Sequence, residues 1–184
     1  MKKPSLFRVR DLLVGLLPAL LMVVLSVMVQ SGDSGAEASA LMWTVTAVMS
    51  SFYGIILYNR KKFLDRINFV TKHGMYIILN GADYTREEIE RTTDETLENW
   101  SKVTGWDGGE KSLKEMYIFF DKEVSFFNVK VEGYYAGEAI HVTQRPKLER
   151  TAFIHELGHR IYNLWKGNKN EKEHHDFMLK HNLD

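Results

Sequence analysis

The chain contains no cysteine, only three prolines and no excess of charge of either sign. The absence of cysteine excludes a disulfide framework, an iron–sulfur cluster and any zinc site with thiolate ligands. Basic and acidic residues balance at 24 each, which argues against a general nucleic-acid binder. Aromatic residues make up 12% of the sequence, and together with the scarcity of proline they argue against disorder. The 184 residues suffice for one full domain but are short for two soluble ones.

Charged residues are absent from two long apolar runs near the N-terminus, residues 12–32 and 38–59. A helix of about 20 residues is roughly 30 Å long, which matches the hydrocarbon core of a bilayer. The segment between the runs, 33–37, is short and polar, so the two helices would be antiparallel. We therefore predict an N-terminal transmembrane hairpin over residues 1–60 and a second domain over residues 61–184.

Basic residues flank the predicted hairpin at both ends, whereas its loop carries Asp33 and Glu37 and no Lys or Arg. The positive-inside rule then places both termini and the second domain in the cytoplasm. A cleaved signal peptide is the alternative, because Lys2 and Lys3 precede the first run and residues 38–40, Ala-Ser-Ala, resemble a cleavage site. The second apolar run favours the uncleaved hairpin. The predicted localisation is thus an integral membrane protein with two spans and contact with the lipid bilayer.

The second domain has the pattern of an α+β fold in which a three- to four-stranded sheet packs on helices. The first helix is predicted from a capping box at Thr85-Arg86-Glu87-Glu88 and ends near Gly105. Pro146 begins a second long helix that ends at Gly167, a residue typical of the position after a helix C-terminus. The other predicted elements are strands over 75–79, 116–120, 126–131 and 139–143 and a last helix over 171–182.

The second long helix contains the motif His155-Glu156-Leu157-Gly158-His159, an H-E-x-x-H pattern. Residues four apart leave one face of a helix, so His155 and His159 can share one Zn²⁺. Glu156 beside them is suited to accept a proton from water as the water attacks a carbonyl group. Burial of such a polar face without a partner would be costly, which favours a metal site over two ordinary histidines.

A third ligand is needed, and histidines are concentrated in the last predicted helix. His174 shares a helical face with apolar neighbours that mark the buried side, so we favour His174 as the third ligand. His175 is the alternative third ligand, and Glu171 or Glu173 would give a site of two histidines and one glutamate. Ni²⁺ or Co²⁺ could occupy a site of three histidines in place of zinc.

The segment from Thr151 to His181 resembles the SprT-like (Spartan-type) zinc metalloproteases and the wider minimal zincins. In that family a third His follows the H-E-x-x-H helix across a turn, and an aromatic residue lies a turn later. The resemblance implies that His155, His159 and His174 are metal ligands and that Glu156 is the general base. The sequence departs from the family in having His175 where a glycine follows the third His. It also cannot form the zinc ribbon common in the family, because it has no cysteine.

Zincins pair an extended substrate with an edge strand above the motif helix, and the strand predicted over 139–143 is the candidate for that role. Its alternative is an ordinary strand within the sheet. A hydrogen-bond donor for the tetrahedral oxyanion would also be needed. Tyr135, Tyr162 and His181 are candidates that the sequence does not rank.

The sequence therefore predicts a membrane-anchored zinc metallopeptidase that hydrolyses peptide bonds, with Zn²⁺ as its cofactor. Its expected partner is a protein or peptide substrate near the membrane, and no nucleic acid is expected to bind. The sequence is also compatible with an oligomer or with a membrane-protein partner. The alternative is a non-enzymatic membrane or assembly protein whose zincin-like domain only binds metal or a partner. The intact Glu156 favours the enzyme.

Overall fold

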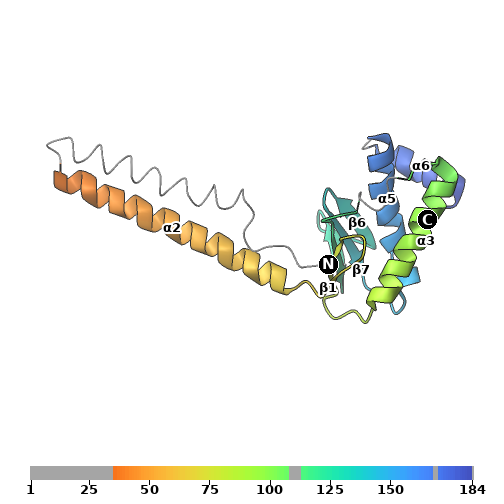
Figure 1. The fold of residues 1–184 in the computed structure, drawn as a ribbon, viewed down its shortest axis with the longest axis horizontal. Helices are drawn as coiled ribbons and strands as arrows, with labels where there is room; N and C mark the ends of the chain where they lie inside the picture. The colour runs from red at the N-terminus through yellow and green to blue at the C-terminus, as the bar shows by residue number, and fades with distance from the viewer. Residues whose placement is uncertain (1–34, 108–112, 168–169, 184) are drawn as a thin grey trace. The chain divides into compact units, whose positions relative to one another are not determined.

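The computed structural model describes residues 35–107, 113–167 and 170–183 (Figure 1). The chain forms two compact units that divide between Asp65 and Arg66. In the first unit the structure describes one element, helix α2 (Gly35–Asp65). The helix continues without a break past residue 60, where the sequence analysis ended the N-terminal unit.

The prediction of a transmembrane hairpin is wrong for the part of the chain that the structure covers. Among the described residues, no helix combines the length and the mean hydropathy needed to cross a membrane. In α2 the hydroxyl side chains of Thr44, Thr46, Ser50 and Ser51 interrupt the apolar sequence, and the helix ends in a basic segment, 60–62. The predicted first span, 12–32, lies outside the described residues. The two-span membrane localisation is contradicted for the same reason.

The second unit is built on a mixed sheet of five strands, larger than the three- to four-stranded sheet that the sequence predicted. Strands β2, β3 and β7 run parallel to one another at its centre, and β1 and β6 lie antiparallel at its two edges. In sheet order the strands are β1 (Phe69–Val70), β2 (Tyr76–Ile78), β3 (Tyr117–Asp121), β7 (Ala139–Thr143) and β6 (Gly133–Ala136). This unit is therefore α+β as expected, but its sheet includes β1 and β6, which the sequence did not predict, and does not include the strand predicted over 126–131.

The strand predicted over 126–131 is instead a hairpin of two short strands, β4 (Val124–Phe126) and β5 (Val129–Val131). Phe127 and Asn128 form the turn between them, with φ angles of 48° and 65°. Two successive residues with positive φ are the mark of the tight turn that matches the twist of paired strands. Asn adopts this conformation readily, whereas the exposed aromatic Phe127 is an unusual residue there.

Helix α3 (Arg86–Thr104) begins and ends as its sequence predicts. The Thr85 side chain accepts a hydrogen bond from the Glu88 backbone N–H, and the Glu88 carboxylate accepts one from the Thr85 N–H at 2.8 Å. This capping box satisfies backbone donors that the helix would leave open. Gly105, with φ 69°, ends the helix in the left-handed conformation. The helix buries Trp100 and Ile89 against the core.

The region predicted as one helix from Pro146 is divided. A short 3₁₀ helix, η1 (Leu148–Arg150), comes first, and α5 (Phe153–Lys166) starts only after Thr151, whose backbone is extended. The Thr151 hydroxyl donates to the Leu148 carbonyl at 2.6 Å and accepts from the Phe153 N–H at 3.2 Å, which fixes the bend between the two helices. The last helix is α6 (Glu171–His181).

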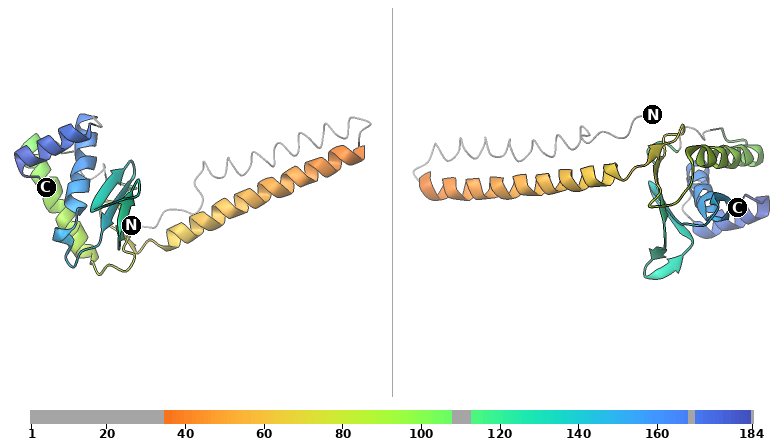
Figure 2. Two further views of the ribbon diagram at one scale, coloured as in Figure 1. Left: turned by 180° about the vertical axis from the view of Figure 1, so that it is seen from behind. Right: turned by 90° about the horizontal axis from the view of Figure 1, so that it is seen from below.

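All three long helices of this unit lie on one side of the sheet, with α5 next to the strands (Figures 1 and 2). Alternate residues of β3 and β7, such as Phe120 and Ile140, are fully buried beneath α5. Phe153, Leu157 and Ile161 form the matching stripe on α5. Burial of each such side chain stabilises the fold by about 1.5–3 kcal/mol relative to exposure. Because this stripe of α5 packs on the sheet, the rotation of the helix about its own axis is fixed, and so are the directions of its other side chains.

Candidate metal centre

Helix α5 holds the two histidines of the H-E-x-x-H motif at one place. Its buried stripe fixes the rotation of the helix, so His155 and His159 leave it together along one flank. The Nε2 atoms of the two imidazoles are 3.1 Å apart. Two nitrogens bound to one tetrahedral zinc at the usual bond length would lie about 3.3 Å apart. The observed separation therefore suits a metal ion shared by both rings.

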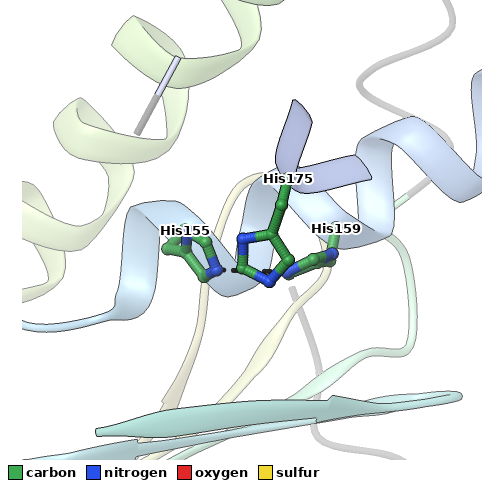
Figure 3. Close-up of side chains that lie close together, drawn as sticks. All are labelled: His155, His159 and His175. Atoms are coloured by element: carbon green, nitrogen blue, oxygen red, sulfur yellow. Dashed lines mark hydrogen bonds between the residues drawn. The ribbon is translucent and has the colours of Figure 1, made fainter. Parts of the chain in front are cut away.

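Helix α6 brings the third imidazole to the motif. Gly167 ends α5 with φ 66°, and its N–H donates to the Asn163 carbonyl, so the chain can turn back toward its own helix. His155 and His159 lie side by side on α5, and the ring of His175 reaches between them from α6 (Figure 3). The ligand atoms of all three lie within 4.8 Å of one another. This cluster could hold a metal ion.

The structure brings His174, the third ligand that the sequence analysis favoured, to a different side of the motif. Its Nδ1 lies 3.1 Å from Nδ1 of His159, the ring nitrogen opposite the one that faces His155. The His174 ring is buried and packs on Tyr162, with ring centroids 4.3 Å apart. The alternative candidate, His175, is the residue whose ring joins His155 and His159. His174 thus lies against Nδ1 of His159, whereas its neighbour His175 belongs to the cluster with His155 and His159.

The remaining ligand and oxyanion candidates are spread over the domain. Glu171 lines the cleft in front of the histidines, whereas Glu173 is exposed and accepts a hydrogen bond from Asn170. Tyr162 is buried and is not among the residues of the cleft wall. His181 packs on Phe177, outside the same wall. Tyr135 does line the cleft.

Glu156 is buried between α5 and the edge strand β6. Its carboxylate accepts a hydrogen bond from the backbone N–H of Tyr135. Burial and, to a smaller extent, the Glu171 carboxylate raise the pKa of this carboxyl group to about 7, against the opposing effect of the Tyr135 hydrogen bond. A carboxyl group poised near neutral pH can accept and return a proton.

The histidine cluster opens into a cleft of about 760 Å³. Strand β6 and the β4–β5 hairpin form its wall opposite the helices, with Phe126, Val131 and Tyr134 as apolar lining. Arg160 of α5 donates a hydrogen bond from Nη1 to the Tyr135 hydroxyl at 3.0 Å, and so ties the helix to the strand. An open cleft with a mixed wall has room for an extended peptide.

The strand predicted to receive the substrate is not at the edge of the sheet. β7 (Ala139–Thr143) pairs with β3 on one side and with β6 on the other, so its backbone groups are occupied and that prediction is wrong. The edge strand beside the motif helix is β6, which the sequence analysis missed. The run Gly133-Tyr134-Tyr135-Ala136 before Gly137 carried a usable signal, because two aromatic residues lie between turn-forming glycines.

The donor set fits a metal ion of intermediate hardness, between hard ions that prefer oxygen and soft ions that prefer sulfur. Three imidazoles with converging nitrogens suit Zn²⁺, Co²⁺, Ni²⁺ or Cu²⁺, and do not suit Mg²⁺ or Ca²⁺, which require oxygen ligands. The ligand atoms spread over at most 4.8 Å, so small side-chain movements would bring all three to one ion.

Comparisons of this chain with protein families, with curated proteins and with solved structures find no match.

Proposed function

We propose that this chain is a zinc-dependent metallopeptidase. The observation that carries the proposal is the convergence of His155, His159 and His175 beside the buried Glu156 in an open cleft. Three neutral ligands and an adjacent carboxylate that is not itself part of the cluster are the parts that hydrolytic zinc sites require. The proposal includes the resemblance to SprT-like and minimal zincin domains, which the motif and the histidine from the following helix support.

Zinc is the metal that we propose for this donor set, among the several that three imidazoles can bind. His155, His159 and His175 would hold the ion with three protein ligands, the number found in catalytic rather than structural zinc sites. When bound, a zinc ion supplies Lewis acidity, which lowers the pKa of water and polarises a carbonyl group. The protein supplies the remaining parts of the reaction.

Glu156 is the proposed general base. Burial raises its pKa to about 7 in the metal-free protein, and a carboxyl group more basic than usual is suited to take a proton from the attacking water. The same carboxyl group would then return the proton to the departing amine. The Tyr135 N–H holds the carboxylate in place between the strand and α5.

Strand β6 is the proposed docking edge for the substrate. The Glu132 carbonyl accepts from the Thr143 N–H at 2.7 Å, and this fixes the antiparallel register between β6 and β7. Backbone groups alternate along a strand, so those of Gly133 and Tyr135 face away from β7 toward the free edge. Apart from the Tyr135 N–H held by Glu156, they are suited to pair with an extended peptide, whose side chains would meet the wall of the cleft.

The proposal is tested by incubating the purified full chain with an unfolded test protein and zinc. Hydrolysis should require zinc, stop on chelation and return when zinc is restored. Replacement of His155 or His175 by Ala should abolish both stoichiometric zinc binding and cleavage, whereas Glu173→Ala, on the exposed side of α6, should change neither. If the chain binds zinc and cleaves nothing, the domain is a metal-binding or assembly module instead.

A further inference from the structure

The two ring nitrogens of His159 face different histidines. Its Nε2 lies 3.1 Å from Nε2 of His155, inside the cluster of His155, His159 and His175. Its Nδ1 lies 3.1 Å from Nδ1 of His174, a buried residue that is not part of that cluster. Both separations are within hydrogen-bonding distance. The two nitrogens of His159 therefore have different neighbours, which bears on where the imidazole carries its proton.

A neutral imidazole carries one proton, so one of its nitrogens donates and the other accepts. If His159 binds a metal through Nε2, its proton must reside on Nδ1, and that N–H points at Nδ1 of His174. His174 can accept it only if its own proton is on Nε2. We propose that His174 is a positioning residue, which fixes the tautomer and the ring orientation of His159 for metal binding. This inference rests on the metal site of the proposed function.

The surroundings of His174 are suited to hold an acceptor in a fixed position. The side chain is 4% exposed, and its ring packs on Tyr162. Tyr162 is in turn held between Trp100, at 6.3 Å, and Phe177, at 5.3 Å, measured between ring centroids. An acceptor held by packing loses little entropy when it hydrogen-bonds a ligand, and partners of this kind commonly affect metal affinity by about 10–100-fold.

Adjacent residues of a helix cannot serve the same role at one metal ion. Successive side chains on α6 point about 100° apart, since the helix has 3.6 residues per turn. When His175 joins the cluster, the buried ring of His174, which also lines the cleft, lies against Nδ1 of His159. The pair His174-His175 thus supplies both a ligand and the group that orients another ligand, which a single histidine at this place could not do.

The test compares zinc affinity, measured by competition with a chelator, in four variants of the full chain. His174→Phe fills the site but removes the acceptor, and His174→Asn offers an amide oxygen near the position of Nδ1. We expect His174→Phe to weaken zinc binding about 10–100-fold and His174→Asn to stay within a few-fold of the wild type. His175→Phe and His175→Asn are the matched controls, and both should lose the site. With Co²⁺ at saturation, the visible spectrum of His174→Phe should match that of the wild type.

Four outcomes would overturn the assignment. His174→Phe could bind zinc as tightly as the wild type, which would leave the hydrogen bond without a role. Its saturated Co²⁺ spectrum could differ from that of the wild type while His175→Phe leaves the spectrum unchanged, which would make His174 the ligand. If His174→Phe does not fold, nitrogen NMR of the zinc-loaded wild type decides, because a proton on Nε2 rather than Nδ1 of His159 contradicts the proposal. A wild type that binds metal without cleaving peptides overturns the proposed activity alone, and one that binds no metal overturns both.

Discussion

Gly158 lies so close to Met178 that a Cβ atom added at Gly158 would be 2.5 Å from the Met178 Sδ. The contact joins the motif helix α5 to α6, the helix that carries His175. Real side-chain atoms do not approach so closely, and Met178 is fully buried, so it has little space into which to move. The glycine inside the motif therefore permits the close helix packing on which the third histidine depends.

Gly158→Ala should destabilise the protein despite the better helix propensity of alanine. The propensity gain is at most about 1 kcal/mol, whereas overpacking a buried contact costs roughly 1–3 kcal/mol. We expect a lower free energy of unfolding in urea and weaker zinc binding, because α6 must shift and carry His175 with it. Combining the change with Met178→Ala should give a favourable coupling energy above about 0.5 kcal/mol. Strictly additive effects would show that the two side chains do not compete for space.

Gly133→Ala should reduce peptide hydrolysis while leaving zinc bound. A Cβ at Gly133 would lie 3.0 Å from Cγ of Glu156, 3.0 Å from the His141 carbonyl oxygen and 3.1 Å from Cβ of Ala152. Because the backbone of β7 cannot yield easily, the side chain of Glu156 has to move from its place. Turnover and zinc stoichiometry are the two measurements. Ala136→Ser, at an exposed position of the same strand, is the control that should keep full activity.

The carboxyl group of Asp94 should support the fold above its folded pKa and lose this effect in acid. Burial alone would raise its pKa, but hydrogen bonds from Lys72 at 2.5 Å and from the buried His73 at 2.8 Å outweigh burial and lower it. A group with a lowered folded pKa contributes stability that disappears as the pH falls through that value. Urea unfolding from pH 7 to pH 2 should therefore show a smaller loss on acidification for Asp94→Asn than for the wild type. Equal losses would contradict the assignment.

In the metal-free protein, Glu156 should change the stability with pH in the opposite direction to Asp94. Its folded pKa of about 7 exceeds the ordinary value of 4.5, so the folded state binds the proton more tightly than the unfolded state. Stability should then fall as the pH rises from about 4.5 to about 7, by no more than roughly 3 kcal/mol. Unfolding in the presence of a chelator measures this slope. Glu156→Gln, which cannot ionise, should reduce the slope, and an unchanged slope would show that another group is responsible.

The parts of the fold that the sequence predicted are those defined by local interactions. The Thr85 capping box, the glycines that end α3 and α5, and the spacing of His155 and His159 each depend on residues within one or two helical turns. Such contacts follow from the chain itself, because neighbouring residues of a helix are fixed in space by its period. The bounds of β7 were also correct, since it lies between a glycine-containing turn and a polar segment.

The parts that the sequence did not predict depend on pairing between distant segments. Strand β6 has only four residues, and its role as the edge appears only when its pairing with β7 is known. The same holds for the choice between His174 and His175. His174 shares a face with apolar neighbours and is buried as that pattern predicts, but the packing of α6 on α5 determines that the ring of His175 joins the cluster. The apolar run of α2 lacks charge, which is typical of a membrane span, but its interspersed hydroxyl groups lower its mean hydropathy.

Glu156→Gln tests the proposed metallopeptidase most directly, because glutamine keeps the shape of glutamate but cannot accept a proton. The measurement is cleavage of an unfolded test protein beside zinc stoichiometry, for the wild type and the variant under the same conditions. Since positioned general bases contribute roughly 10²–10⁴-fold, we expect hydrolysis to fall by at least about a hundredfold while one zinc ion stays bound. A variant that binds zinc and cleaves as fast as the wild type would contradict the account.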